Sequence, residues 1–359
     1  MIKFYRGCGA VNCVTALPLI ALLTIGLKGQ TSFATSENSG VFDNIEAQIK
    51  SLVSTPGDGK IKGTYSTKHL LDSYSAGVQH VQGIAWLTDG RFALSHNSRS
   101  DRRGLFIVQS SDSDSVIVPI GGGGDHPGGI QAAGRVVAVP ITGGKDEVVF
   151  MDCRQAKLPL ELTHLRISNA ERTTGAAGFA FDRKRGCHWV LTTNAAFAYG
   201  FGPSTLYKSN GKSLYDPECR FTKFGELANV FASQGGTQML FDSSGTMYIA
   251  ALYRVEPSGE KNLTRNTQGM TATKEGTEMI ALTKVSDPEK PENGGTLLLD
   301  KKLSDSGEWT DYGAGFRWGG TIMKSPDGKI WVAAVSRTLA YGPAEQFAKT
   351  KIWVQPPGG

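Results

Sequence analysis

Two histidines stand at the same place in a repeated sequence pattern and could do acid–base chemistry. His80 lies three residues before Gly83 in the segment HVQGI, and His126 lies three residues before Gly129 in HPGGIQ. An imidazole titrates near neutral pH, so it can act as a general base or as a metal ligand. Two imidazoles brought to one place could therefore abstract a proton or hold a metal ion.

The glycine of this pattern recurs at the start of five short apolar runs. The other three are Gly178 in AAGFAFD, Gly236 in QGGTQMLFD and Gly320 in WGGTIM. Each run is followed by further runs rich in β-branched and aromatic residues, separated by Gly, Asp, Asn and Pro turns, which predicts an all-β domain. Four strands per unit are expected at 81–87, 91–97, 104–109 and 115–120; 128–132, 135–141, 147–152 and 160–167; 177–182, 187–193, 204–208 and 219–225; and 236–242, 246–254, 277–285 and 295–303.

The fifth unit is one strand short, with runs only at 319–324, 329–337 and 350–354. A strand-like run at 61–69 precedes the first unit and has no partner of its own. If it supplies the missing outer strand, a ring closes and two open sheet edges are buried. Repeats of this length resemble the blades of β-propellers, and Asp-Gly turns such as Asp89-Gly90 and Asp327-Gly328 support that resemblance. We therefore expect a five-bladed β-propeller of four-stranded blades over 61–359, with a β-sandwich as the alternative.

Propeller geometry would gather basic side chains at the mouth of the central channel. An inner strand begins on the face where the second strand of its blade ends, so both sets of residues crowd the same opening. The residues expected there to bind a ligand are Gln82, Arg99, Asn194, Arg254, Arg317 and Arg337, and Tyr253 precedes one of the arginines. The planar guanidinium fork suits a carboxylate, sulfate or phosphate. The pattern indicates an anionic ligand, with an acidic glycan as the leading candidate; bridging neighbouring blades is the alternative role for Gln82 and Gln131.

The same residues suggest a reaction. A neutral His80 or His126 could act as base and Tyr253 as proton donor while an arginine neutralises the substrate carboxylate. This set resembles that of propeller-fold polysaccharide lyases in fold and residue type. Two alternatives stay open: a non-catalytic lectin or protein-interaction scaffold, and a metal-dependent hydrolase whose metal is held by His80 and His126. Whether the chain is an enzyme is left undecided between these.

Two long excursions, 195–203 and 256–275, follow second strands and are expected on the face of the channel mouth. Long loops on one side of a scaffold commonly shape a binding site. Phe197, Tyr199 and Phe201 in the first excursion could stack on sugar rings, with an aromatic lid over an apolar rim as the alternative.

The N-terminus reads as a processing signal. Lys3 and Arg6 precede an apolar stretch at 11–27, and Ser32-Phe33-Ala34 offers small residues for cleavage, so 1–34 is expected to be a signal peptide. We then expect a secreted or periplasmic protein without a membrane span after cleavage. Residues 35–60 are expected to form a polar lead with one helix packed on the outside of the propeller.

The charge and composition of the chain limit the kinds of ligand or partner that it is expected to bind. The net charge of +5 comes without a Lys/Arg block or a base-stacking pattern, which argues against nucleic acid. We expect a monomer with a small-molecule or glycan ligand. Cys153, Cys187 and Cys219 remain after signal removal; one disulfide with a leftover thiol and three buried thiols are both compatible with their spacing.

Overall fold

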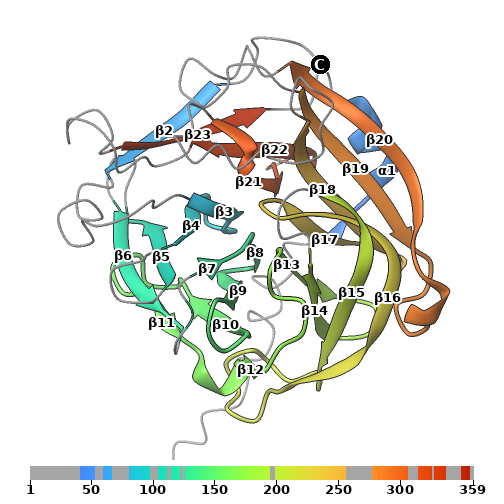
Figure 1. The fold of residues 1–359 in the computed structure, drawn as a ribbon, viewed down its shortest axis with the longest axis horizontal. Coiled ribbons are helices and arrows are strands. Elements are labelled where there is room, and N and C mark those ends of the chain that lie inside the picture. The colour runs from blue at the N-terminus through green and yellow to red at the C-terminus, as the bar shows by residue number, and fades with distance from the viewer. Residues whose placement is uncertain are drawn as a thin grey trace, which may run out of the picture. The chain divides into compact units, whose positions relative to one another are not determined.

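Five small β-sheets form a ring (Figure 1). The computed structural model describes residues 41–52, 60–66, 81–97, 104–110, 115–121, 124, 126–194, 199–255, 277–305, 314–325, 327–336 and 349–355. The chain divides into two compact units, Met1–Phe33 and Ala34–Gly359, and all described residues belong to the second. The sheets follow one another in chain order, which confirms the predicted five-bladed β-propeller.

The strands group into blades as follows. Blade 1 holds β3 (Val81–Trp86), β4 (Phe92–His96), β5 (Gly104–Gln109) and β6 (Ser115–Ile120). Blade 2 holds β7 (His126–Pro127), β8 (Gln131–Ala133), β9 (Val136–Thr142), β10 (Glu147–Asp152), β11 (Leu160–Glu161) and β12 (Ile167–Ser168), with a short 3-10 helix, η2 (Thr163–Leu165), between the last two. Blade 3 holds β13 (Ala177–Asp182), β14 (Cys187–Thr193), β15 (Tyr199–Ser209) and β16 (Phe221–Ser233).

Blade 4 holds β17 (Thr237–Asp242), β18 (Met247–Val255), β19 (Thr277–Val285) and β20 (Thr296–Asp305), with the 3-10 helix η3 (Pro291–Asn293) before β20 and the short β1 (Val41–Phe42) beside β17. Blade 5 runs β21 (Ala314–Lys324), β22 (Ile330–Ser336), β23 (Lys349–Gln355) and β2 (Lys60–Ser66) from the inside outward. The face on which β3, β7, β13, β17 and β21 begin is called the upper face below.

The N-terminal strand closes the ring as predicted. β2 pairs antiparallel with β23, from Lys60 opposite Val354 to Ser66 opposite Lys349, and becomes the outermost strand of blade 5. The last blade is thus built from both ends of the propeller, which leaves no blade one strand short.

Two of the repeated glycines, Gly83 and Gly129, lie where inner strands of different blades touch through their backbones. A Cβ on Gly83 would stand 2.7 Å from the Cα of Gly129, and one on Gly319 would stand 2.9 Å from the Cα of Gly83. The amide of Gly129 also donates to the carbonyl of Gln234 at 3.0 Å. Only glycine permits backbones to approach this closely, so the contact between blades requires glycine at positions 83 and 129.

That contact also explains a difference from prediction in blade 2. The inner strand expected at 128–132 is split into β7 and β8. The amide of Gly128 still bonds to Pro140 of β9, but the amide of Gly129 bonds to the Gln234 carbonyl between blades 3 and 4 and so interrupts the ladder. The outer strand expected at 160–167 is likewise two short strands around η2. In blade 3 the strands are longer than predicted: β15 and β16 extend well beyond the expected ranges 204–208 and 219–225.

Glutamines join the blades at their inner strands. Gln131 Oε1 accepts hydrogen bonds from the amides of Phe179 (2.8 Å) and Met239 (2.6 Å), and its Nε2 donates to the Met239 carbonyl (2.7 Å). Gln238 Nε2 donates to the main chain of blade 2 at 3.1 Å, and Gln238 Oε1 accepts from the Thr321 hydroxyl at 3.1 Å. The blade-bridging role for Gln131 is therefore confirmed, and these buried side chains fasten blades 2 to 5 to one another.

The predicted helix, α1 (Ile45–Ser51), packs against blades 4 and 5. Ile45, Ile49 and Leu52 are buried in one apolar cluster with residues of both blades, such as Leu282 and Val332. Among the described residues no helix has the length and apolar character needed to cross a membrane.

Candidate functional site

His126 and Gln82 meet at the upper face, across the boundary of blades 1 and 2. His126 is half-buried at the start of β7, Gln82 is buried in β3, and their Nε2 atoms lie 3.3 Å apart. An amide at this distance can fix the orientation of the imidazole ring. His80 lies outside the described residues, so a pair of histidines at the channel mouth stays a prediction. Within the described ranges, no three His, Cys, Asp or Glu side chains are grouped so that they could hold a metal ion.

Arg254 forms a buried ion pair that the sequence did not reveal. Its Nη1 lies 3.7 Å from Oε1 of Glu278 on the neighbouring strand β19, and both side chains are almost fully buried. Glu278 Oε2 also accepts the amide of Phe316 in β21 at 2.9 Å. The charge of Arg254 is therefore offset by a carboxylate that also holds the inner strand of blade 5.

Three further arginines, Arg99, Arg317 and Arg337, are predicted to lie at the channel mouth. Arg317 belongs to β21, but its side chain is outside the described part of the chain, as are Arg99 and Arg337 entirely. The predicted arginine cluster therefore stays a prediction. Asn194, at the end of β14, is exposed on the upper face and its Oδ1 accepts the hydroxyl of Thr174 at 3.2 Å.

Tyr253 and Arg254 point to opposite faces of β18, because successive side chains alternate along a strand. Tyr253 turns toward blade 3 and its hydroxyl donates to Oδ1 of Asp300 on β20. Burial, followed by the hydrogen bond to Asp300, raises the pKa of Tyr253 well above its usual value. The structure thus does not bring Tyr253 beside Arg254, and the role of Tyr253 as proton donor stays a prediction.

Four aromatic rings line the seam between blades 3 and 4 at the upper face; we call Tyr199, Phe201, Phe231 and Tyr253 the aromatic shelf. The rings of Tyr199 and Tyr253 have centroids 4.1 Å apart, and Phe201 meets Phe231 edge-on at 5.1 Å and 89°. Phe231 in turn contacts Tyr253 at 5.2 Å. Phe231 and Tyr253 are buried and Tyr199 is partly buried, whereas Phe201 is 59% exposed. The shelf is therefore a cluster of contacting aromatic rings with one ring presented to solvent.

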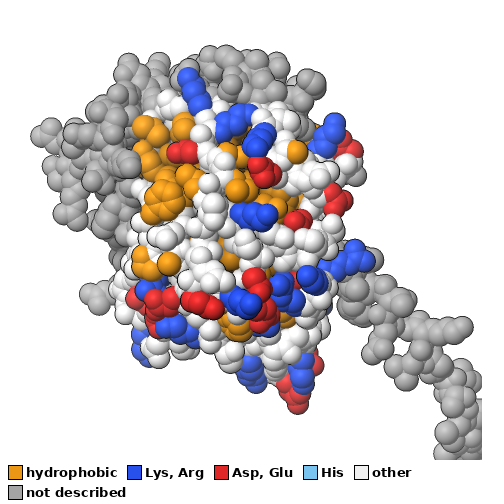
Figure 2. Space-filling model, turned by 90° about the vertical axis from the view of Figure 1, so that its right-hand side faces the viewer, with side chains coloured by type: hydrophobic (Ala, Val, Ile, Leu, Met, Phe, Trp, Pro, Cys, Tyr) orange, Lys and Arg blue, Asp and Glu red, His pale blue; other side chains and the backbone are white. Residues whose placement is uncertain are grey.

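The side of the ring that carries the outer strands of blades 3 and 4 has exposed apolar surface. Figure 2 looks at the side of the ring that carries β16 and β20, and hydrophobic side chains gather in the upper left of this view. Leu297 of β20, 37% exposed, adds to the exposed apolar surface of this side. Tyr199 and Phe201 lie in the excursion expected to stack on sugars, while Phe197 lies outside the described residues. Sequence reasoning missed Phe231 and Asp300. Phe231 lies on β16, the strand paired with the excursion in β15, whereas Asp300 lies on the outer strand of blade 4 and carried no signal.

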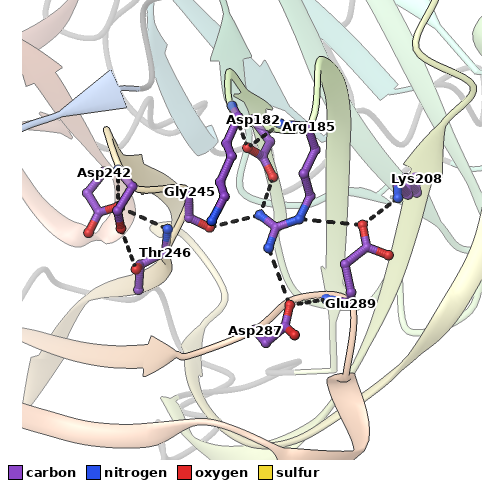
Figure 3. Close-up of polar contacts among 10 residues, drawn as sticks. Asp182, Arg185, Lys208, Asp242, Gly245, Thr246, Asp287 and Glu289 are labelled. Carbon is purple, nitrogen blue, oxygen red and sulfur yellow. Dashed lines mark hydrogen bonds and ion pairs between the residues drawn. The ribbon is translucent and has the colours of Figure 1, made fainter.

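A charged network lies on the face opposite the upper face, and its described side chains pair with one another (Figure 3). Arg185, in the turn after β13, donates to Asp182 at 2.6 Å and to the Gly245 carbonyl at 2.9 Å, and it contacts Asp287 at 3.3 Å. Asp242 is engaged by the amide of Thr246 at 2.9 Å. These side chains close turns and join blades 3 and 4, which marks the network as structural.

The other histidines and the cysteines that the structure describes have packing roles. His96 is buried and its Nδ1 lies 2.7 Å from the Asn97 carbonyl, and His164 Nε2 lies 2.9 Å from the Leu214 carbonyl. His188 is buried against Phe181, with centroids 4.8 Å apart. Cys153, Cys187 and Cys219 are buried free thiols, which answers the open question of a disulfide among them.

No protein-family model and no curated protein matches this sequence. Among solved structures, the chain is similar to an exo-1,5-α-L-arabinanase from a bovine ruminal metagenomic library (12% identity, 78% of this chain and 94% of that chain, TM-score 0.36). It is also similar to the GH43 protein BlXynB from Bacillus licheniformis (11%, 77% and 51%, TM-score 0.36) and to the Cps50 (Swd1) β-propeller domain of Myceliophteria thermophila (10%, 76% and 83%, TM-score 0.30). Likenesses this slight carry no argument about ligand or activity, so function must be argued from the residues themselves.

Proposed function

We propose that this propeller binds a glycan at its upper face, with the aromatic shelf as the surface on which a sugar ring stacks. The observation that carries the proposal is that Phe201 is 59% exposed while its ring packs edge-on against Phe231, which in turn contacts Tyr199 and Tyr253. Aromatic rings supply a large apolar contact area at a small cost in conformational entropy, and here the inner rings already hold Phe201 in place. A sugar ring presents one apolar face of C–H groups, which such a surface complements.

The polar side of the proposed site is the channel mouth. His126, oriented by Gln82 at 3.3 Å, is the described group best suited to move a proton there. Cleavage of an acidic glycan by elimination extends the proposal, with His126 as base and the predicted arginines neutralising the carboxylate. A lectin without catalysis needs only the shelf.

Replacing Phe201 by Ala should weaken glycan binding by about tenfold, the loss expected for one aromatic contact. Binding can be measured by calorimetry with neutral pentose and hexose oligosaccharides and with oligogalacturonates. Phe224→Ala is the matched control, because Phe224 lies on the same hairpin, is 36% exposed and packs on Trp189 rather than on the shelf. Equal affinities for Phe201→Ala and the unaltered protein, or no binding across the panel, would refute the proposal.

Catalysis is tested separately by following the ultraviolet absorbance of unsaturated uronate ends. A signal that is lost in His126→Ala supports the elimination reaction. Glycan binding without such a signal assigns the protein to the lectins.

A further inference from the structure

We propose that Asp300 is a specificity-determining residue of the shelf, accepting hydrogen bonds from the hydroxyl groups of a neutral sugar stacked on it. This inference rests on the proposed function, whose shelf it uses. It names the substrate class as a sugar with free ring hydroxyls and assigns uronates the weaker binding at this position.

The Asp300 carboxylate lies on the same face of blade 4 as Tyr253. Asp300 lies on β20 opposite Ala281 of β19, and Ala281 belongs to the same apolar cluster as Tyr253 and Phe231. Paired residues of neighbouring strands share a face of the sheet. Asp300 is therefore on the blade face that turns toward blade 3 and the shelf, and it is exposed.

A hydrogen bond from Tyr253 holds the Asp300 carboxylate in place. Tyr253, whose ring contacts Tyr199 at 4.1 Å, donates its hydroxyl to Oδ1 of Asp300. An ionised carboxylate has two oxygens and about four acceptor positions, so Oδ2 and part of Oδ1 remain for a ligand. Neighbouring hydroxyls of a sugar ring can each donate to one oxygen, in the way that a carboxylate accepts a two-pronged donor.

The negative charge of Asp300 distinguishes neutral sugars from uronates. Lys302 shares this face of β20, opposite Met279, so Asp300 and Lys302 are its charged side chains within the described part of the strand. Asp300 is the charged side chain that is bonded to a ring of the shelf. A uronate carboxylate brought to this position meets a like charge, whereas neutral hydroxyls meet a charged acceptor, which makes hydrogen bonds roughly twice as strong as neutral ones.

Asp300→Asn tests the inference, because the amide keeps an acceptor for Tyr253 but loses the charge. We expect affinity for neutral oligosaccharides to fall about tenfold or more, and affinity for oligogalacturonates to stay the same or rise. Glu292→Gln is the control, since Glu292 is an exposed carboxylate of the same blade in η3. Asp300→Glu, which restores the charge, should recover part of the neutral-sugar affinity, and thermal melting of each variant verifies that the fold is kept.

The result that overturns the inference is an Asp300→Asn protein with unchanged affinity for both ligand classes while Phe201→Ala still loses binding. In that case the shelf binds glycans without help from Asp300. If neither substitution changes binding, the proposed function itself falls.

Discussion

At the scale of single residues, two buried polar side chains of this protein show opposite behaviour. Gln131 satisfies its amide with three main-chain hydrogen bonds from two other blades. His188 lies 1% exposed beside Phe179 and Phe181, and both of its ring nitrogens lack a hydrogen-bond partner. A buried amide with full partners fixes how blades dock, whereas a buried imidazole without partners links stability to pH.

Burial lowers the pKa of His188 from 6.5 to about 3. The unfolded chain therefore binds a proton that the folded protein rejects, so this contribution to stability is complete above pH 6.5 and is lost as pH falls toward 3. Between pH 6.5 and 5 the free energy of unfolding should drop by about 2 kcal/mol from this residue. Urea unfolding at both pH values should show a smaller drop for His188→Leu, whereas His164→Gln should keep the full drop; identical drops in all three proteins would contradict the assignment.

At the scale of elements, the two-residue period of a strand decides which residues can share a site. The sequence placed Tyr253 and Arg254 at one opening because they adjoin at the end of a second strand. β18 sends one to the seam with blade 3 and the other to Glu278 and blade 5. Repeat alignment locates the end of a strand well, but it does not say which seam each side chain enters.

The glycine-initiated inner strands give the element-scale prediction. Gly83→Ala should reduce the free energy of unfolding by about 1–3 kcal/mol, the usual range for overpacking, because the new Cβ meets main-chain atoms at 2.7 and 2.8 Å that have no freedom to move aside. Gly202→Ala in β15 is the control, since no atom lies within 4 Å of its added Cβ. Chemical denaturation of both variants measures the difference, and equal losses would show that the inner-strand contact is not limiting.

At the scale of the whole propeller, the blade count could be predicted because the same physical demand recurs in every blade. Close backbone contact requires glycines such as Gly83 and Gly129, and tight hairpins require left-handed glycines such as Gly90 (φ 87°) and Gly328 (φ 81°). The candidate site could be predicted only in part. Phe201 and Tyr199 carried a signal through their excursion, whereas Glu278 and Asp300 reach their partners through pairings between strands that no local pattern encodes.

Ring closure gives the prediction at this scale. A chain that begins after Ser66 lacks β2 and exposes the edge of β23, so it should lose cooperative unfolding and aggregate. A chain beginning at Val41 keeps β1, α1 and β2 and should unfold in one transition. Calorimetry and size-exclusion chromatography compare the two, and a monomeric, cooperatively folded short chain would contradict the closure argument.

The pairing of β2 with β23 also determines which blade of the propeller is completed last during folding. Lys60 and Val354 are partners although nearly the whole propeller lies between them in sequence, so blade 5 is complete only after the last strand has left the ribosome. Until then residues 60–66 lack the partner with which they form β2, whereas the four preceding blades can form from local hairpins. Final assembly is thus a post-synthetic step of long loop closure, the slow kind of event, and whatever keeps β2 from pairing elsewhere in that interval governs the yield of folded protein.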